Sequence, residues 1–116
     1  MSRHPEKLTI LRGTLDVLVL QAVSARPLHG FDVSLWLDER SGSTLRLDDS
    51  ALYQCLHRLE ARGLISGTWG VSENNRRARY YEITEEGRRH LATKGERLLS
   101  FARMVTTLLA PDSSRG

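Results

Sequence analysis

Two β-prone runs that follow three helical segments constrain the fold of this 116-residue chain more than any other feature. Residues 64–69 and 78–83 are rich in Ile, Trp and Tyr, and a polar stretch centred on residues 73–76 separates them. Asparagine tolerates the left-handed backbone conformation, so the chain can turn at Asn74-Asn75. The pattern therefore predicts a β-hairpin in the second half of the chain.

The side chains of this hairpin divide between two faces, because neighbouring residues of a strand point to opposite sides. One face holds Arg77, Arg79, Tyr81 and Ile83. Tyr81 and Ile83 can pack into the core and anchor the hairpin. Arg77 and Arg79 project near its tip, where Arg76 adds a further positive charge. The net charge of the chain is only +3. This local cluster therefore indicates an anionic partner such as a phosphate backbone, with a solvated basic loop as the alternative interpretation.

Three helical segments precede the hairpin. In residues 8–22, apolar positions that include Leu11, Leu15 and Leu18 recur at spacings of three and four. Further apolar residues surround that stripe, so the first helix must be covered from more than one direction, and a second chain could supply part of the cover. We expect a second helix over residues 31–39. Its apolar residues are Phe31, Leu35, Trp36 and Leu37.

The third helical segment, residues 49–62, carries the most information about function. Asp48 is a favourable N-cap before it, and Gly63 ends it. At 100° per residue, the apolar face consists of Leu52, Leu56 and Leu59, with Cys55 at its edge. The opposite face presents Tyr53, Gln54, His57 and Arg58. These side chains suit base edges and phosphates, although for a helix in isolation an ordinary polar solvent face is the more frequent explanation.

A fourth helix is expected to start after Thr84, whose hydroxyl can cap it ahead of two glutamates. Its apolar residues form two heptad series. The first consists of Leu91, Leu98 and Val105, and the second of Phe101 and Leu108. A domain this small has little remaining surface against which these apolar residues can pack. The two series therefore predict contact with another chain. The alternative is a helix that folds back on its own core.

These segments together predict a mainly α fold with a small β-hairpin, namely a winged helix-turn-helix with a C-terminal dimerisation helix. We expect a DNA-binding domain over residues 8–83, the dimerisation helix over residues 84–110 and a disordered tail over residues 111–116.

Several classes of protein are disfavoured by the sequence. Cys55 is the only cysteine and the four histidines lie far apart, so neither an intrachain disulfide nor a metal site is expected. No familiar catalytic motif occurs, and we expect neither enzymatic activity nor a cofactor. No apolar run approaches the ~20 residues needed to span a bilayer, and the N-terminus does not resemble a signal peptide. We therefore expect a cytoplasmic protein that does not interact with membranes.

With these motifs in order, the sequence resembles the PadR family of bacterial transcriptional regulators, specifically the short subgroup with one C-terminal helix. The resemblance covers about residues 8–109. It rests on residues 27–31, Leu52-Tyr53, residues 56–60, residues 63–65, Trp69, Glu73-Asn74, Arg76-Arg77, Tyr80-Tyr81 and residues 83–87. Two departures stand out. Asn75 occupies the position of a common wing glycine, and Asp48-Asp49 replaces a more usual uncharged start of the recognition helix.

The resemblance implies a homodimeric transcriptional repressor that binds double-stranded DNA. Its third helix would lie in the major groove, and its hairpin wing would contact the adjacent backbone or minor groove. The DNA-binding residues would be Ser50, Ala51, Tyr53, Gln54, His57, Arg58, Asn75, Arg76, Arg77 and Arg79. The dimerisation residues would be Leu11, Leu15, Leu91, Leu98, Phe101, Val105 and Leu108. A small-molecule effector that releases DNA is also compatible with the resemblance.

Two further interpretations accompany this one. A winged helix can serve as a protein-interaction module, but such modules usually lack a basic wing. A carrier with a small-molecule pore at the dimer interface is compatible with a regulator that binds an effector there.

Overall fold

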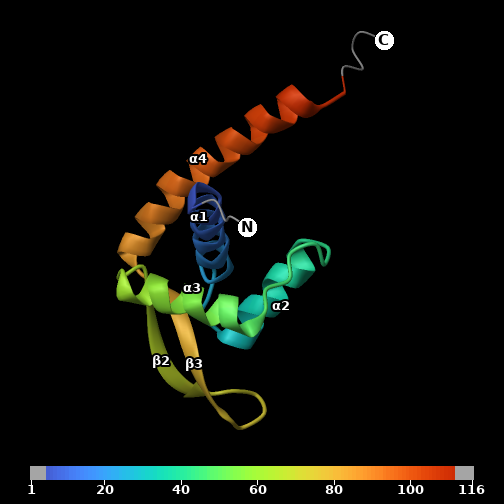
Figure 1. The fold of residues 1–116 in the computed structure, drawn as a ribbon. Helices are drawn as coiled ribbons and strands as arrows, with labels where there is room; N and C mark the ends of the chain where they lie inside the picture. The colour runs from blue at the N-terminus through green and yellow to red at the C-terminus, as the bar shows by residue number, and fades with distance from the viewer. Residues whose placement is uncertain (1–4, 112–116) are drawn as a thin grey trace.

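The computed structural model describes residues 5–111, with side chains from Gly13 onward (Figure 1). Four helices and three strands follow in the order α1 (Pro5–Ala22), β1 (Leu28–His29), α2 (Gly30–Arg40), α3 (Asp49–Ala61), β2 (Ile65–Val71), β3 (Arg77–Ile83) and α4 (Glu85–Leu109). This arrangement is the expected winged helix-turn-helix with one long C-terminal helix. Of the tail expected to be disordered, residues 112–116 lie outside the described residues.

The core lies where α1, α2 and α3 meet the root of the sheet. Its most deeply buried side chains come from all of these elements, and they are Val19, Leu20, Val23, Val33, Leu52, Cys55, Leu56, Leu59 and Ile65. Tyr81 and Ile83 of β3 are also buried, as the strand alternation predicted. The apolar face expected for the third helix is confirmed, with Cys55 fully inside it.

The sheet has three antiparallel strands in the order β1-β3-β2, one more than the sequence indicated. β1 pairs Leu28 with Tyr81, and two residues are too few to produce a recognisable periodicity. β2 and β3 pair from Ile65 opposite Ile83 to Val71 opposite Arg77. The hairpin is therefore longer at its tip than expected, and it projects away from the helices (Figure 1).

The expectation for the apolar face of the second helix is partly wrong. Phe31 is 69% exposed and Leu35 is also exposed, whereas Val33 and Leu37 are buried. Val33 and Leu37 lie one turn apart, so both face the core when the helix starts at Gly30. Trp36 is half-buried against the core, and the Arg40 guanidinium lies 4.8 Å from its ring centroid.

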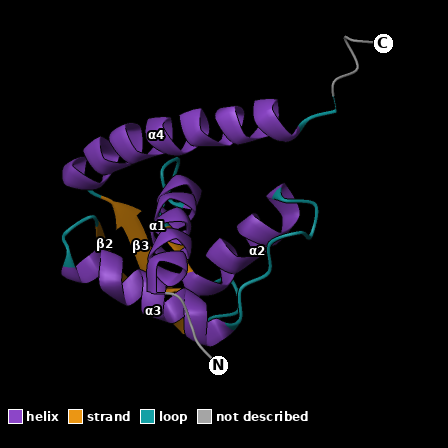
Figure 2. Ribbon diagram, turned by 45° about the horizontal axis from the view of Figure 1, so that its top comes forward, coloured by secondary structure: helices purple, strands orange, loops and turns teal. Residues whose placement is uncertain are grey.

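The root of α4 is tied to the end of α3. The Thr84 hydroxyl accepts a hydrogen bond from the Gly87 N–H at 2.9 Å and donates one to the Gly63 carbonyl at 2.7 Å. A side chain at Gly87 would overlap the Leu64 carbonyl, so the two backbones meet without an intervening side chain. From this fixed start α4 passes across α1 and leaves the body of the molecule (Figure 2).

A buried carboxylate joins α1 to α3. Asp16 is only 4% exposed. It accepts a hydrogen bond from Arg58 Nη2 at 2.7 Å, from Arg62 Nη1 at 3.4 Å and from the Cys55 thiol at 3.2 Å. Burial, followed by the neighbouring Asp16, raises the pKa of Cys55 to about 12. The thiol is therefore protonated and acts as a donor to the carboxylate.

This network corrects the expectation that Arg58 points outward beside Gln54 and His57. The Arg58 side chain instead turns along α3 toward α1, where the Asp16 carboxylate neutralises its charge. A helix position on the boundary between two faces can present its side chain to either one, and a buried countercharge decides the direction.

We predict that Asp16→Asn destabilises the protein by about 3 kcal/mol, because Arg58 loses the charge that compensates its partial burial. Urea unfolding at one protein concentration measures the change, with Glu96→Gln on the exposed surface of α4 as control. The control should differ from wild type by less than about 0.5 kcal/mol. Equal stability of Asp16→Asn and wild type would show that the network contributes nothing.

Candidate nucleic-acid interface

The exposed face of α3 presents several hydrogen-bonding side chains without apolar cover. The Asp48 carboxylate caps the helix by accepting the Ala51 N–H at 2.7 Å. One turn further, the Gln54 amide lies 3.4 Å from the Ser50 hydroxyl. Gln54 and His57 are exposed. Donors and acceptors therefore run along this face from the first turn to the middle of the helix.

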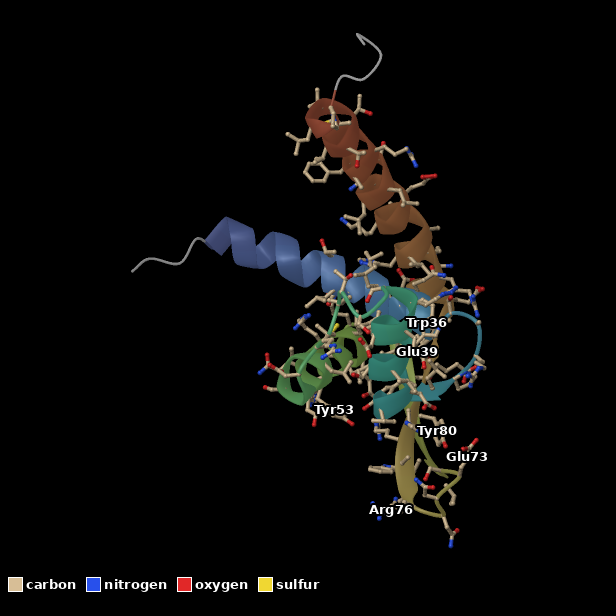
Figure 3. The ribbon with its side chains drawn as sticks, turned by 90° about the vertical axis from the view of Figure 1, so that its right-hand side faces the viewer. Trp36, Glu39, Tyr53, Glu73, Arg76 and Tyr80 are labelled. Carbon is tan, nitrogen blue, oxygen red and sulfur yellow. The ribbon has the colours of Figure 1, made fainter. Side chains whose placement is uncertain are left out.

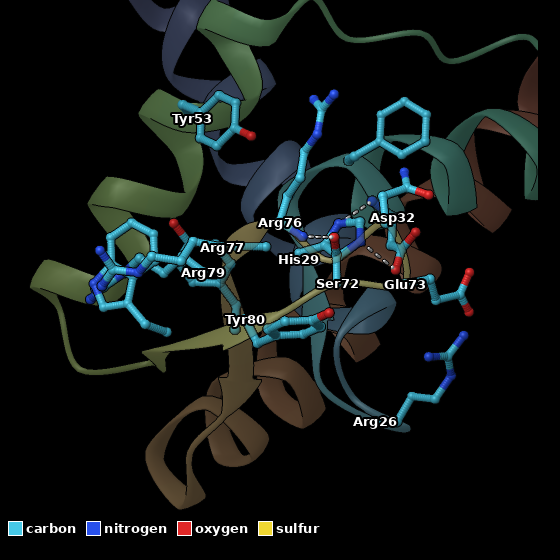
Figure 4. A pocket seen from close by; sticks show the side chains of 16 residues that line it. Arg26, His29, Asp32, Tyr53, Ser72, Glu73, Arg76, Arg77, Arg79 and Tyr80 are labelled. Carbon is cyan, nitrogen blue, oxygen red and sulfur yellow. Dashed lines mark hydrogen bonds and ion pairs between the residues drawn. The ribbon is translucent and has the colours of Figure 1, made fainter.

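Tyr53 joins this face to the start of α2. Its side chain is 50% exposed, and a Cβ added to Gly30 would lie 2.6 Å from its hydroxyl oxygen. The absence of a side chain at Gly30 therefore lets the phenol lie against the backbone of α2. Tyr53 points into the space between α3 and the hairpin (Figure 4).

The wing turns through residues 72–76. The Ser72 N–H donates to the Arg76 carbonyl at 2.8 Å, and the Asn75 N–H donates to the Ser72 carbonyl at 2.9 Å. Asn75 has a φ of 62°, so the turn expected at Asn74-Asn75 is confirmed. Asparagine adopts this left-handed conformation at a lower cost than most residues. The turn thus forms without the usual glycine.

The three wing arginines have different surroundings. Arg76 lies at the tip and is exposed (Figure 3). Arg77 is exposed too, with its guanidinium 4.5 Å from the Trp69 ring centroid. Arg79 instead forms an ion pair with Glu60 of α3, and this hydrogen bond raises the pKa of its guanidinium. The expectation that all three project at the tip therefore holds for Arg76 and Arg77 and is wrong for Arg79, which links the wing to α3.

A groove of about 850 Å³ lies between the wing, Tyr53 and the start of α2 (Figure 4). The cations that line it include Arg26, Arg76 and Arg77. Among the described residues, no carboxylate lies within ion-pairing distance of these three guanidinium groups. Asp32 and Glu73 are the acidic residues of the lining. Arg26 was missed in the sequence, where a single arginine before Pro27 carries no distinctive signal.

His29 stabilises the wall of the groove at the start of α2. Its Nδ1 accepts the Asp32 N–H at 3.3 Å, and its Nε2 lies 3.3 Å from the Asp32 carboxylate. The imidazole also meets the Tyr80 ring edge to face, with 5.3 Å between ring centroids. An uncharged His29 with its proton on Nε2 satisfies both contacts, so this residue caps α2 and packs against the wing.

Of the expected DNA-binding residues, the structure brings Tyr53, Arg76, Arg77 and Arg79 together around this groove. Ser50, Ala51, Tyr53, Gln54 and His57 lie on α3, and Asn75, Arg76 and Arg77 lie on the wing. Arg58 and Arg79 are instead engaged in ion pairs within the protein.

Comparison with known proteins places this arrangement in a family. Residues 19–93 match the PadR-like family of transcriptional regulators. The chain belongs to this family. Membership makes it a transcriptional regulator, which implies regulation through DNA binding. A curated protein of Lysinibacillus sphaericus, described as uncharacterized, is 26% identical over 83 residues, which are 72% of this chain and 76% of that protein.

Solved structures share the fold of this PadR-like chain over nearly its whole length. A transcriptional regulator from Clostridium thermocellum is 24% identical with a TM-score of 0.76, covering 87% of this chain and 98% of that one. A PadR-like regulator from Bacillus cereus is 24% identical with a TM-score of 0.75, covering 90% and 99%. A PadR family regulator from Eggerthella lenta is 27% identical with a TM-score of 0.71, covering 92% of each chain. Across the described part of our chain, no helix is long and apolar enough to cross a membrane.

We predict that Gly30→Ala displaces Tyr53 without destabilising the protein, because the atoms nearest to the new methyl group belong to the end of the Tyr53 side chain, which can move. Because Gly30 is the first residue of α2, the gain in helix propensity should be smaller than the roughly 1 kcal/mol of a helix interior. The Tyr53 ring resonances should shift in NMR spectra, and DNA affinity should fall. Gly95→Ala in α4 is the control, since its added methyl group has room. Unchanged Tyr53 resonances in Gly30→Ala would contradict the contact.

Proposed function

We propose that this protein is a sequence-specific repressor that binds a pseudo-palindromic operator as a homodimer. The observation that carries the proposal is the groove that Tyr53 of α3 shares with the cationic wing. A winged helix that presents a polar helix beside a basic hairpin can read a major groove and hold the neighbouring phosphates at once.

In this proposal α3 supplies the base contacts. Gln54 is exposed, and its amide can make paired hydrogen bonds to the edge of an adenine. Tyr53 and His57 are exposed as well and can donate hydrogen bonds to phosphates. The N-terminus of α3 also carries Asp48 and Asp49, whose negative charges repel phosphates. We therefore place the DNA backbone away from the first residues of the helix.

The wing supplies the phosphate contacts. Arg76 and Arg77 are exposed, and Arg26 adds a third cation to the same groove. The Trp69 ring beneath Arg77 holds the guanidinium extended while leaving its N–H groups available. Arg79 contributes indirectly, because its ion pair with Glu60 holds the wing to α3.

The outer half of α4 supports the dimer. Phe101, Met104 and Leu108 are exposed in the single chain, and Leu108 is 73% exposed. Such an apolar stripe on a helix that projects from the body fits a second copy related by two-fold symmetry. Leu15 and Leu91 pack against the core of their own chain, so their share of the interface is smaller. The side chain of Leu11 lies outside the described residues.

We predict that changes in the wing and in α3 impair DNA binding differently. Arg76→Ala with Arg77→Ala should weaken binding to every sequence and lower the log–log salt slope by about 2, one for each lost phosphate contact. Gln54→Ala should cost about 1–3 kcal/mol at one base pair and relax the preference there. Fluorescence anisotropy over a salt series measures both effects.

Arg89→Ala is the matched control, since this arginine pairs with Glu86 on α4, away from the groove. Its affinity and slope should equal those of wild type. Wild-type levels of affinity and sequence preference in both the wing variant and Gln54→Ala would refute the interface. Absence of any specific DNA binding by the wild type would favour the protein-interaction module instead.

We predict that Leu108→Asp weakens the dimer about a hundred-fold or more, because a carboxylate would be buried in an apolar interface. The fold of each chain should persist, since Leu108 makes little contact within it. Sedimentation velocity measures the association, and DNA affinity should decrease with it. Thr107→Asp, on the neighbouring exposed position, is the control. A monomeric wild type at micromolar concentration would remove the dimer from the mechanism.

A further inference from the structure

Phe31 is the most exposed apolar side chain of α2, and the contacts described so far give it no role. Its ring is 69% exposed, although it is the second residue of a helix that packs on the core. Val33 and Leu37 form the buried side of α2. At 100° per residue, Phe31 lies about 200° around the helix from Val33. The packing that buries Val33 therefore keeps Phe31 on the outer side of α2.

Neighbouring rings define the surroundings of Phe31. The centroid of the His29 ring lies 6.4 Å from that of Phe31, and His29 in turn meets the Tyr80 ring of the wing edge to face. The Tyr53 ring lies against the backbone of the adjacent Gly30. His29 is held by Asp32 and Tyr80, so it cannot move over Phe31 without losing those contacts. The Phe31 ring is therefore the end of an aromatic row that stays open to the groove.

The groove that Phe31 lines has an excess of positive charge. Its lining contains four arginines and two acidic residues, and Arg26, Arg76 and Arg77 have no ion pair with a carboxylate of the described residues. These cations suit a polyanion, and membership in a family of transcriptional regulators makes DNA the polyanion to expect. An aromatic hydrocarbon ring in such a groove has no donor or acceptor for a phosphate. It can contact only the apolar groups of the DNA.

Two kinds of apolar group are available on DNA, and only one of them carries sequence information. Every nucleotide offers the same sugar carbons, whereas the C5-methyl group of thymine distinguishes this base in the major groove. Phe31 lines the groove together with Tyr53 of α3, the helix proposed to read the bases. Its ring therefore borders both the base-reading helix and the cations that hold phosphates. In that position it can meet a methyl group that projects from a base edge.

We propose that Phe31 is a specificity-determining residue whose ring contacts the C5-methyl group of one thymine in each half-site of the operator. The proposal rests on the proposed function, because it names a base that the same groove selects. The contact removes about one methyl group from water. Its loss should therefore lower DNA affinity about four-fold for each half-site, which is the value of one buried carbon group of this size.

The test uses the intact protein and an operator that it selects from random-sequence duplex DNA. Each thymine of the operator is replaced in turn, in both half-sites at once, by deoxyuridine, which lacks only the methyl group. For wild type we expect a position at which this replacement lowers affinity about four-fold per half-site. Phe31→Ala should bind the thymine operator more weakly than wild type, and replacement at that position should no longer change its affinity. Effects of deoxyuridine at thymines read by α3 should persist in this variant.

Two further variants separate the thymine contact from other effects. Phe31→Leu keeps an apolar side chain and should retain a difference between thymine and deoxyuridine at the same position. Leu35→Ala is the matched control, since Leu35 is exposed one turn further along α2 and does not line the groove. It should respond to each deoxyuridine as wild type does. Thermal unfolding of Phe31→Ala should match that of Leu35→Ala, because both side chains are exposed, and this excludes unfolding as the cause of weaker binding.

Two outcomes would overturn the thymine contact and leave the proposed function intact. The first is wild-type affinity of Phe31→Ala for the operator. The second is weaker binding by Phe31→Ala with wild-type responses to every deoxyuridine, which would mean that the ring lies against sugar carbons. If wild type selects no operator at all, the proposed function is refuted, and the thymine contact with it.

Discussion

The contact between Asp16 and Arg58 determines how α3, the proposed recognition helix, is held. α3 packs on the core through leucines, and such contacts fix its distance from α1 more strictly than its rotation. A buried carboxylate with a donor at 2.7 Å and a second at 3.4 Å adds a directional constraint, because a turn of the helix would leave charges without partners. The buried apolar face of α3 and this constraint act together to leave its polar face exposed.

The wing depends on α3 in turn. A two-stranded hairpin is only marginally stable alone, and this one gains a short third strand at β1 and the ion pair between Arg79 and Glu60. A side chain at Gly67 would collide with the Arg79 guanidinium, so the glycine gives the arginine room to lie across the sheet. The recognition helix and the wing therefore form one unit, which keeps the groove between them open.

The two halves of the long helix α4 have different surroundings. Its first turns are tied to the end of α3 through Thr84 and Gly87, whereas Phe101, Met104 and Leu108 remain exposed on its outer half. Between them, Lys94 and Arg97 line a cleft together with Asp16 and Val17 of α1. A change in the packing of α4 against α1 would therefore affect the proposed dimer interface. Through Arg62 and Asp16 it would also affect α3.

Local patterns in the sequence were enough to predict the winged helix. The caps at Asp48 and Thr84, the turn at Asn75 and the buried face of α3 depend on residues close in the chain, so periodicity and capping chemistry reveal them. The roles of Arg58 and Arg79 could not be predicted in this way. Their carboxylate partners lie 42 and 19 residues away, and only the packing of α1 and the wing against α3 brings these charges together. An aspartate among the apolar residues of the first helix was the one available signal of a buried partner. Its sequence position could not reveal which arginine that partner would be, because a long flexible side chain takes its direction from the countercharge that the tertiary structure places near it.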